Sequence, residues 1–202
     1  MQLLTSMLDW WFPPRAEERL VRSLVATTIT PTPTYPAPNT VCLLPFAHPH
    51  VTALIHEAKF YHNQRAHAVL GEVLATYITQ YVPHVAILPI PLHPARERRR
   101  GFNQVTTCLR TNPSLRAQLY PQLLTRVRNT KPQTTLSATD RAENVRHAFT
   151  VRQPTRTAID PAVPLLLVDD VYTTGATLNA ARTAIRAAFP QHTIHCLAIA
   201  YA

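Results

Sequence analysis

Apolar and polar positions along this chain follow patterns that predict both helices and buried strands. Helical spacing of apolar residues, three and four positions apart, extends over residues 51–82. Short continuous apolar runs predict buried strands at residues 85–90, 165–168 and 194–200. Further helices are predicted over residues 1–26, from Asn103 onward and over residues 178–188. Strands that alternate with helices pair in parallel, so we expect an α/β fold with a parallel sheet flanked by helices.

Residues 27–45 separate the N-terminal helical segment from the rest of the chain. Four of the nine residues at positions 30–38 are prolines, which favours an extended linker. A plain spacer is the simpler interpretation, and a proline-rich docking segment is the alternative. The predicted organisation is a helical segment and linker at residues 1–45, followed by one domain at residues 46–202.

Composition adds an argument from charge. The 202-residue chain has 20 Lys and Arg residues against 11 Asp and Glu residues, a net charge of +9, and its only lysines are Lys59 and Lys131. Such a balance favours phosphorylated metabolites, nucleic acid or an anionic surface as partners, and a basic surface that serves solubility is the alternative. The dominance of arginine fits phosphate binding, because a guanidinium group binds phosphate in a bidentate manner.

Cysteine spacing and hydropathy argue against several classes of protein. Cys42, Cys108 and Cys196 are far apart and none has CxxC spacing, so neither a disulfide framework nor a zinc site is expected. No apolar run approaches the roughly 20 residues that a membrane span needs. The N-terminus lacks the basic leader of a signal peptide, so we expect a cytoplasmic protein.

The residues after the 165–168 strand carry the clearest chemistry. Asp169 and Asp170 stand at the carboxyl end of that strand, and the residues that lead into the next helix are Thr173, Thr174, Gly175, Ala176 and Thr177. A helix start offers unpaired N–H groups and a positive dipole to an anion, and glycine lets the backbone approach it closely. The carboxylates would repel a phosphate, so their partners are sugar hydroxyls, a metal ion or a developing positive charge. A ribose 5-phosphate group satisfies both halves, whereas a capped helix beside a solvated turn is the structural alternative.

A second candidate anion site follows the 85–90 strand. Arg96, Arg98, Arg99 and Arg100 lie beside Gly101, and a solvated charge run is the alternative interpretation. The chain has only three glycines, and Gly101 and Gly175 both fall in candidate phosphate loops. Because ligands of parallel sheets bind at the carboxyl ends of strands, this position favours a loop that holds a pyrophosphate.

A third stretch, residues 124–149, is polar and rich in arginine. It is too polar to form core, and we expect a mobile cover over the site, with a short helix at residues 140–146.

These three segments, in this order, resemble the ComF family, the competence-associated branch of the phosphoribosyltransferase-like proteins. The residues that carry the resemblance are Pro89, Pro91, Leu92, His93, Pro94, Arg96, residues 100–104, Arg126, Thr130, Gln133, Leu136, Arg141, Asn144, Val145 and residues 168–177. The resemblance covers residues 51–202, and residues 1–14 also resemble a ComF start. A four-cysteine zinc module normally follows in that family, but Cys42 is the only cysteine before residue 108 here. The module is therefore absent or lacks its metal.

The resemblance implies a type I phosphoribosyltransferase fold, in which a parallel sheet lies under a small flexible hood. It also implies 5-phosphoribosyl 1-pyrophosphate (PRPP) as ligand, with Mg²⁺ bridging the pyrophosphate and the ribose. By position, Asp169 and Asp170 would hold the ribose hydroxyls and residues 173–177 the 5′-phosphate. The pyrophosphate side would be lined by Arg96, Arg100 and Gly101, and a closing loop would contain Arg126, Gln133 and Arg141. No side chain is assigned as a Mg²⁺ ligand, because PRPP itself would hold most of the metal's coordination.

Whether the chain is an enzyme stays open at this point. Some relatives in the wider superfamily carry a carboxylate base three residues after the second acid, and that position here is Thr173. Three hypotheses follow: a phosphoribosyltransferase of unknown acceptor, a non-catalytic PRPP-binding sensor or adaptor in DNA uptake, and a nucleic-acid-binding protein that uses its arginines. Against the third, no aromatic-rich pattern interleaves with the arginines along the sequence.

Overall fold

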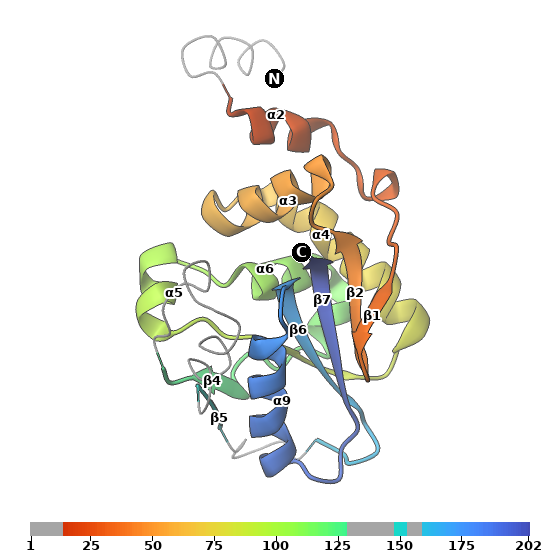
Figure 1. The fold of residues 1–202 in the computed structure, drawn as a ribbon, viewed down its shortest axis with the longest axis vertical. Coiled ribbons are helices and arrows are strands. Elements are labelled where there is room, and N and C mark those ends of the chain that lie inside the picture. The colour runs from red at the N-terminus through yellow and green to blue at the C-terminus, as the bar shows by residue number, and fades with distance from the viewer. Residues whose placement is uncertain (1–13, 129–147, 153–158) are drawn as a thin grey trace.

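A computed structural model describes residues 14–128, 148–152 and 159–202 of the chain. Its central five-stranded sheet has the order β1-β2-β7-β6-β3 (Figure 1). The strands are β1 (Thr34–Ala37), β2 (Thr40–Pro45), β3 (Ala86–Pro89), β6 (Leu165–Tyr172) and β7 (Ile194–Tyr201). Strands β2, β7, β6 and β3 pair in parallel with their neighbours in this order. Strand β1, at one edge of this sheet, pairs antiparallel with β2. The predicted α/β fold with a parallel sheet is confirmed.

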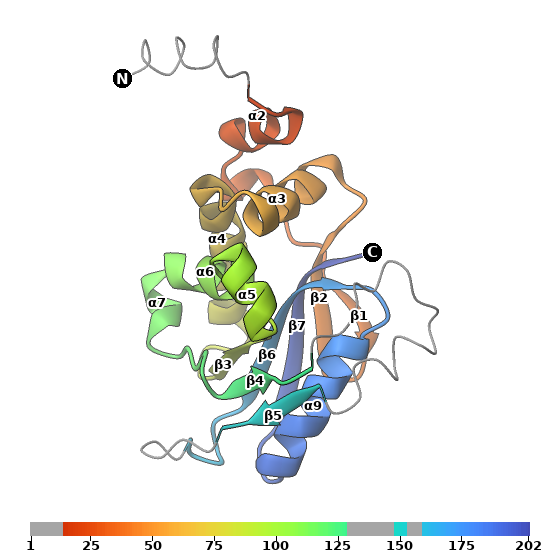
Figure 2. The same cartoon turned by 90° about the vertical axis from the view of Figure 1, so that its left-hand side faces the viewer.

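Alternating side chains of the strands enter two cores, one on each face of the sheet. Leu166 and Val168 of β6 join the core under α4 (Gln64–Tyr81) and α6 (Gln104–Thr111). Leu165 and Leu167 join the core under α9 (Ala176–Ala188) and a two-stranded sheet of β4 (Leu124–Arg126) and β5 (Phe149–Val151). Figure 2 shows the sheet between these two sides. Burial on both faces explains why the strands are continuous apolar runs.

The remaining helices lie around the carboxyl end of the sheet. The hood consists of α2 (Ala16–Ser23) and α3 (Pro49–Phe60), which lie beyond the arrowheads of β6 and β7 in Figure 1. A guanidinium–carboxylate pair joins the two helices, since Arg15 donates from Nε and Nη2 to the buried Glu57 at 3.1 and 2.9 Å. The other elements are a short 3₁₀ turn η1 (Ala26–Thr28), α5 (Pro94–Arg100) and α7 (Pro113–Arg116).

The structure differs from the sequence expectations in four places. The predicted linker at 27–45 contains two strands, since residues 34–37 form β1 and residues 40–45 form β2. Val41 to Leu44 are buried, because an apolar run next to prolines can still pair with β7. The 51–82 helix is two helices, broken where His62 takes a positive φ of 52°. The arginine-rich loop is helix α5, which begins with Pro94 at its first turn. The 124–149 stretch is core at both ends, where Leu124 and Phe149 are buried.

The division of the chain into two parts stays a prediction, since residues 1–13 lie outside the described residues. The helix expected at 140–146 also lies outside them.

All three cysteines are buried and free. Within the described ranges, no helix combines the length and the hydropathy that crossing a bilayer requires.

Candidate functional site

Asp169 and Asp170 lie near the carboxyl end of β6, below the hood. The strand continues past its apolar half to Tyr172, so that both acids belong to the sheet and not to a loop. Pairing of Asp169 with Ala198 of β7 fixes their position. Asp170 is buried with 8% of its surface exposed, whereas Asp169 is partly exposed and borders a hollow described below.

The carboxylate of Asp170 has three hydrogen-bonding or ionic partners from three parts of the chain. Gln104, at the start of α6, donates from Nε2 to Oδ2 at 2.7 Å. Lys59, in the last turn of α3, places Nζ 3.1 Å from the same oxygen. The backbone N–H of Val171 donates to Oδ1 at 2.8 Å. Asp170 therefore ties the hood and α6 to the end of β6.

The two acids titrate differently. Burial, followed by the charge of Asp170, raises the pKa of Asp169 to about 7. Burial also opposes ionisation of Asp170, but the charge of Lys59 and the hydrogen bonds from Lys59, Gln104 and Val171 outweigh it and lower the pKa of Asp170. Asp170 is therefore negatively charged at neutral pH, whereas the pKa of Asp169 lies close to neutral pH.

Two arginines predicted for the pyrophosphate side lie one helical turn apart on α5. Arg100 donates from Nη1 to Oε1 of Gln104 at 2.5 Å, so a chain of two hydrogen bonds links it to Asp170. Arg96 stands four residues earlier and shares that helical face. The exposed Gly101 ends the helix with a positive φ of 87°, which favours glycine. Among the residues that the structure describes, no atom outside its chain neighbours lies within 4 Å of where its Cβ would stand.

Arg126, expected on the closing loop, lies in strand β4 and is 7% exposed. Its guanidinium carbon stands 5.4 Å from the ring centroid of Phe149. Burial, then the charge of Arg96, lowers the pKa of Arg126, and Asp169 acts in the opposite direction. Arg126 is thus a fixed cation beside the acids. The other two residues predicted for that loop, Gln133 and Arg141, lie outside the described residues.

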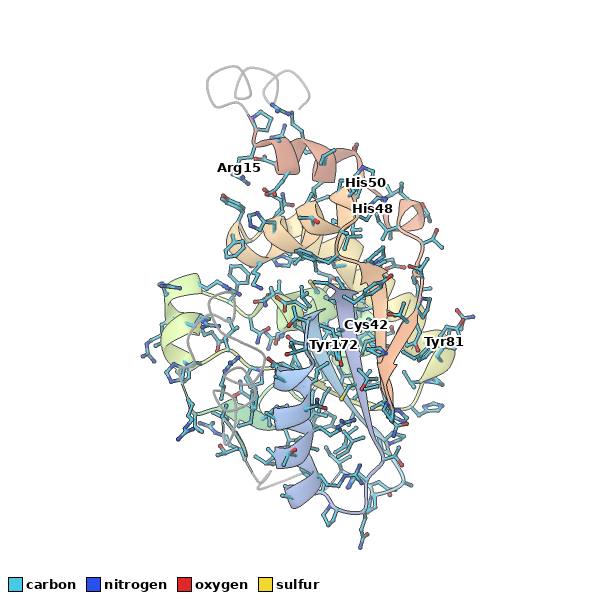
Figure 3. The ribbon with its side chains drawn as sticks, in the orientation of Figure 1. Arg15, Cys42, His48, His50, Tyr81 and Tyr172 are labelled. Carbon is cyan, nitrogen blue, oxygen red and sulfur yellow. The ribbon has the colours of Figure 1, made fainter. Side chains whose placement is uncertain are left out.

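The segment between β6 and α9 forms a small open hollow next to Asp169. The residues that line it are Asp169, Val171, Tyr172, Thr173, Gly175, Ala176, Thr177 and Leu178. Thr174 is exposed and is not among them. Gly175 caps α9 with a φ of 73°, and the ring of Tyr172, labelled at the end of β6 in Figure 3, packs against it. The predicted phosphate loop is therefore placed against Asp169 at the start of a helix.

Two residues of the site were not predicted. Lys59 was noted only as one of two lysines, and Gln104 only as part of a resemblance. Each contacts Asp170 from a distant part of the sequence, and no local pattern signals such a contact. The one available signal is that Gln104 begins a helix directly after the Asn103 N-cap, in the segment that also carries the arginines.

Comparisons with known proteins place the chain among named relatives. It is 40% identical to "Competence protein F" of Haemophilus influenzae over 97 residues, which are 46% of this chain and 41% of that protein. It is 34% identical to "DNA utilization protein YhgH" of Salmonella typhi and 32% identical to that of Escherichia coli K12, in both cases over 64% of this chain and 58% of the relative. The resemblance to the ComF family is confirmed. The chain spans about half the length of these curated ComF relatives.

Two other comparisons add little to this. No protein-family model matches the chain. A solved adenine phosphoribosyltransferase from Leishmania tarentolae superposes with a TM-score of 0.44 at 11% identity, covering 84% of this chain and 94% of that one. The assignment to a parallel α/β fold with a hood rests on the strand order and helix positions of the structure itself.

The two positive-φ glycines give a first test of the site's construction. Gly175→Ala should lower the free energy of unfolding by about 1–3 kcal/mol, because an L-residue is strained at this φ and its Cβ would meet the Tyr172 ring. Gly101→Ala is the matched control, since it has the same strain but open space around the Cβ. Chemical denaturation should show the larger loss for Gly175→Ala. Equal losses would contradict close packing of Tyr172 on the loop.

The raised pKa of Asp169 predicts how stability depends on pH. Its folded-state pKa of about 7 exceeds the reference value of 3.8, so stability is lost as pH rises between these values and Asp169 ionises. Asp169→Asn removes that loss. The melting temperature of the variant, relative to wild type, should therefore be higher at about pH 8 than at about pH 5. A difference that does not change with pH would contradict the raised pKa of Asp169.

Proposed function

We propose that this chain binds PRPP, with the ribose on Asp169 and Asp170 and the 5′-phosphate at the start of α9. One observation carries the proposal. Asp169, next to Asp170 in the chain, lines the hollow together with Thr173, Gly175 and Thr177, so a group suited to a sugar and groups suited to a phosphate stand side by side. A free phosphate would not need the acids, and a plain sugar would not need the helix start.

The chemistry of the loop supports the phosphate end. A helix start presents N–H groups that have no partner within the helix, together with the positive end of the helix dipole. The helix that follows Gly175 has 13 residues, long enough for a full dipole effect at its first turn. Gly175 supplies the positive φ from which this helix starts.

The arginines support the pyrophosphate end. Arg100 and Arg126 are partly or fully buried, and Arg96 lies on the same face of α5 as Arg100. Burial strengthens the attraction between a guanidinium group and a phosphate, since water screens it less. The Arg100–Gln104–Asp170 hydrogen bonds place this cationic side next to the acids. PRPP carries a 5′-phosphate at one end of its ribose and a pyrophosphate at the other. It therefore matches a site with the acids between two anion-binding groups.

Mg²⁺ fits the donor set of the proposed site. Magnesium binds through one or two carboxylates and substrate phosphates, and it keeps several waters. In the described part of the chain no group of three or more His, Cys, Asp or Glu side chains is suited to a metal ion, so the protein alone offers no closed cage. Asp169 and Asp170 would offer it carboxylate oxygens. Bound with PRPP, the ion would neutralise pyrophosphate charge.

If the ligand is turned over, the step is a substitution at the anomeric carbon of the ribose. The bond from that carbon to pyrophosphate breaks, and pyrophosphate leaves with the electron pair. The acceptor supplies the electron pair of the new bond to the same carbon. Positive charge on the ribose ring would be stabilised by Asp170, which keeps its negative charge. Thr173 stands exposed where a carboxylate base could act, so the chain offers no base there. This favours binding without transfer, or transfer to an acceptor that needs no base.

The relatives named for competence and for DNA utilization suggest the setting. We propose that the chain acts in the cytoplasm in the handling of imported DNA, either as a transferase or as a PRPP sensor. Pyrophosphate release separates these two, since only a transferase produces it.

Binding can be measured by thermal stability with PRPP and Mg²⁺. A ligand at about 100 times its Kd should stabilise the wild-type chain by about 2.7 kcal/mol, and less without Mg²⁺. Asp170→Asn should weaken binding by about 10- to 100-fold, because charge-assisted hydrogen bonds to the ribose are lost. The matched control is Asp160→Asn, an exposed acid outside the site, which should keep the full shift. A wild-type melting temperature that PRPP and Mg²⁺ leave unchanged would contradict the proposal.

A further inference from the structure

Asp170 forms an ion pair with the hood. Lys59, in the last turn of α3, places Nζ 3.1 Å from Oδ2, and Gln104 donates to the same oxygen at 2.7 Å. The backbone N–H of Val171 donates to Oδ1. Both oxygens of this carboxylate are therefore engaged in the structure, although a bound ribose or metal ion would need at least one of them.

Two of these three partners are fixed. The N–H of Val171 belongs to strand β6 itself. Gln104 is buried, and Arg100 holds the other end of its amide by donating to Oε1 at 2.5 Å. The side chain of Lys59, in contrast, is 31% exposed, and within the described ranges its Nζ has no second hydrogen-bonding or ionic partner. Lys59 is thus the partner that can leave Asp170.

The helix that carries Lys59 does not have to move for this. Glu57, two residues earlier, is fully buried and accepts hydrogen bonds from two other side chains. The carbonyl oxygen of Ala58 lies 3.0 Å from Nε2 of the buried His67. Both residues before Lys59 are therefore held in place, so it is the flexible four-carbon stem of the lysine that can carry its charge away from Asp170.

The type of residue supports an exchangeable contact. Of the 20 Lys and Arg residues in the chain, all except Lys59 and Lys131 are arginine. An arginine can bind a carboxylate through two parallel hydrogen bonds, whereas the ammonium group of a lysine is a point charge on a flexible stem. The position that contacts Asp170 thus carries the less directional and more mobile of the two cations.

The ammonium group of Lys59 acts on both carboxylates. Burial acts to raise the pKa of Asp169 and of Asp170, and the charge of Lys59 acts to lower the pKa of each. Its positive charge thus compensates negative charge that is largely shielded from water. A divalent ion on the same oxygens would compensate more of this charge, but it would be repelled by the ammonium group.

We propose that Lys59 is an internal counterion, which occupies the place of the divalent cation on Asp170 until that ion and PRPP bind. Binding then replaces the ion pair, and the ammonium group moves into solvent while α3 keeps its position. The inference rests on the proposed function, because it assigns the cation of that site to Asp170. Lys59 limits the affinity of the empty site for free metal ions, so the ion binds well only together with the phosphates of PRPP.

Mn²⁺, which takes the same oxygen ligands as Mg²⁺, tests the proposal without PRPP. Electron paramagnetic resonance of the free ion gives the Kd of Mn²⁺ for the full chain. Lys59→Met removes the charge but keeps an unbranched side chain, and it should tighten Mn²⁺ binding about tenfold or more, because repulsion from a charge beside Asp170 is lost. Lys59→Arg should bind Mn²⁺ no more tightly than wild type, since the charge stays.

Two further variants test whether the gain depends on Asp170. Arg186→Met removes an exposed positive charge in the last turn of α9, at the end of that helix away from the hood in Figure 1, and should leave the Kd of Mn²⁺ nearly unchanged. Asp170→Asn added to Lys59→Met should abolish the gain. The proposal is overturned if Lys59→Met binds Mn²⁺ no more tightly than wild type, if Arg186→Met gains as much, or if the gain survives the loss of Asp170.

The wild-type protein gives a second test that does not depend on how the Lys59 variants fold. Because the chain has only two lysines, nuclear magnetic resonance of protein labelled at lysine Cε gives two side-chain signals, and Lys131→Arg assigns them. The Lys59 signal should narrow when PRPP and Mg²⁺ are added, as the side chain leaves its ion pair and becomes mobile. A Lys59 signal that stays unchanged while PRPP binds would overturn the proposal.

Thermal stability with PRPP and Mg²⁺ on the same proteins separates this inference from the proposed function. Lys59→Met should show a shift at least as large as that of wild type. A smaller shift would make Lys59 a ligand of PRPP and overturn its role as a counterion. Absence of a PRPP shift in the wild type, together with tighter Mn²⁺ binding by Lys59→Met, would overturn only the proposed function.

Discussion

Two carboxylates on consecutive residues at the end of a buried strand must be compensated, since charged groups out of water are costly. Asp170 receives that compensation from Lys59 and Gln104, and Arg100 joins through Gln104. These partners come from the hood and from helices on one face of the sheet. The demand of the acids for positive partners therefore decides where three separate segments meet. Asp169 receives less compensation, and its raised pKa follows from that.

The same constraint explains the charge distribution that we propose for the ligand. Its centre would carry hydroxyl groups or a metal ion against the acids, and its two ends would carry anionic groups. The acids would repel a phosphate, so we propose the hollow at the start of α9, next to Asp169, for the 5′-phosphate. Arg100 of α5 is linked to Asp170 through Gln104, and Arg126 of β4 interacts electrostatically with Asp169. Lys59 occupies part of the space near Asp170 in the absence of ligand, so a bound ribose or metal ion has to share or replace this ion pair.

Much of this arrangement follows from local sequence. The buried strand at 165–168, the acid pair at its carboxyl end and the helix that follows Gly175 were each predicted from a pattern within about ten residues, and each is found. Contacts between distant segments could not be predicted. The contacts of Lys59 and Gln104 with Asp170 depend on how helices pack, which hydrophobic periodicity does not specify. The β2 strand was missed because the prolines before it dominated the local signal.

The most direct test of the PRPP site is a crystal structure of the full chain with PRPP and Mg²⁺. The 5′-phosphate should lie within about 3 Å of backbone N–H groups at residues 173–177, with the ribose hydroxyls on Asp169 and Asp170. The pyrophosphate should face Arg96 and Arg100. PRPP bound elsewhere, or with its pyrophosphate on the α9 loop, would contradict the account.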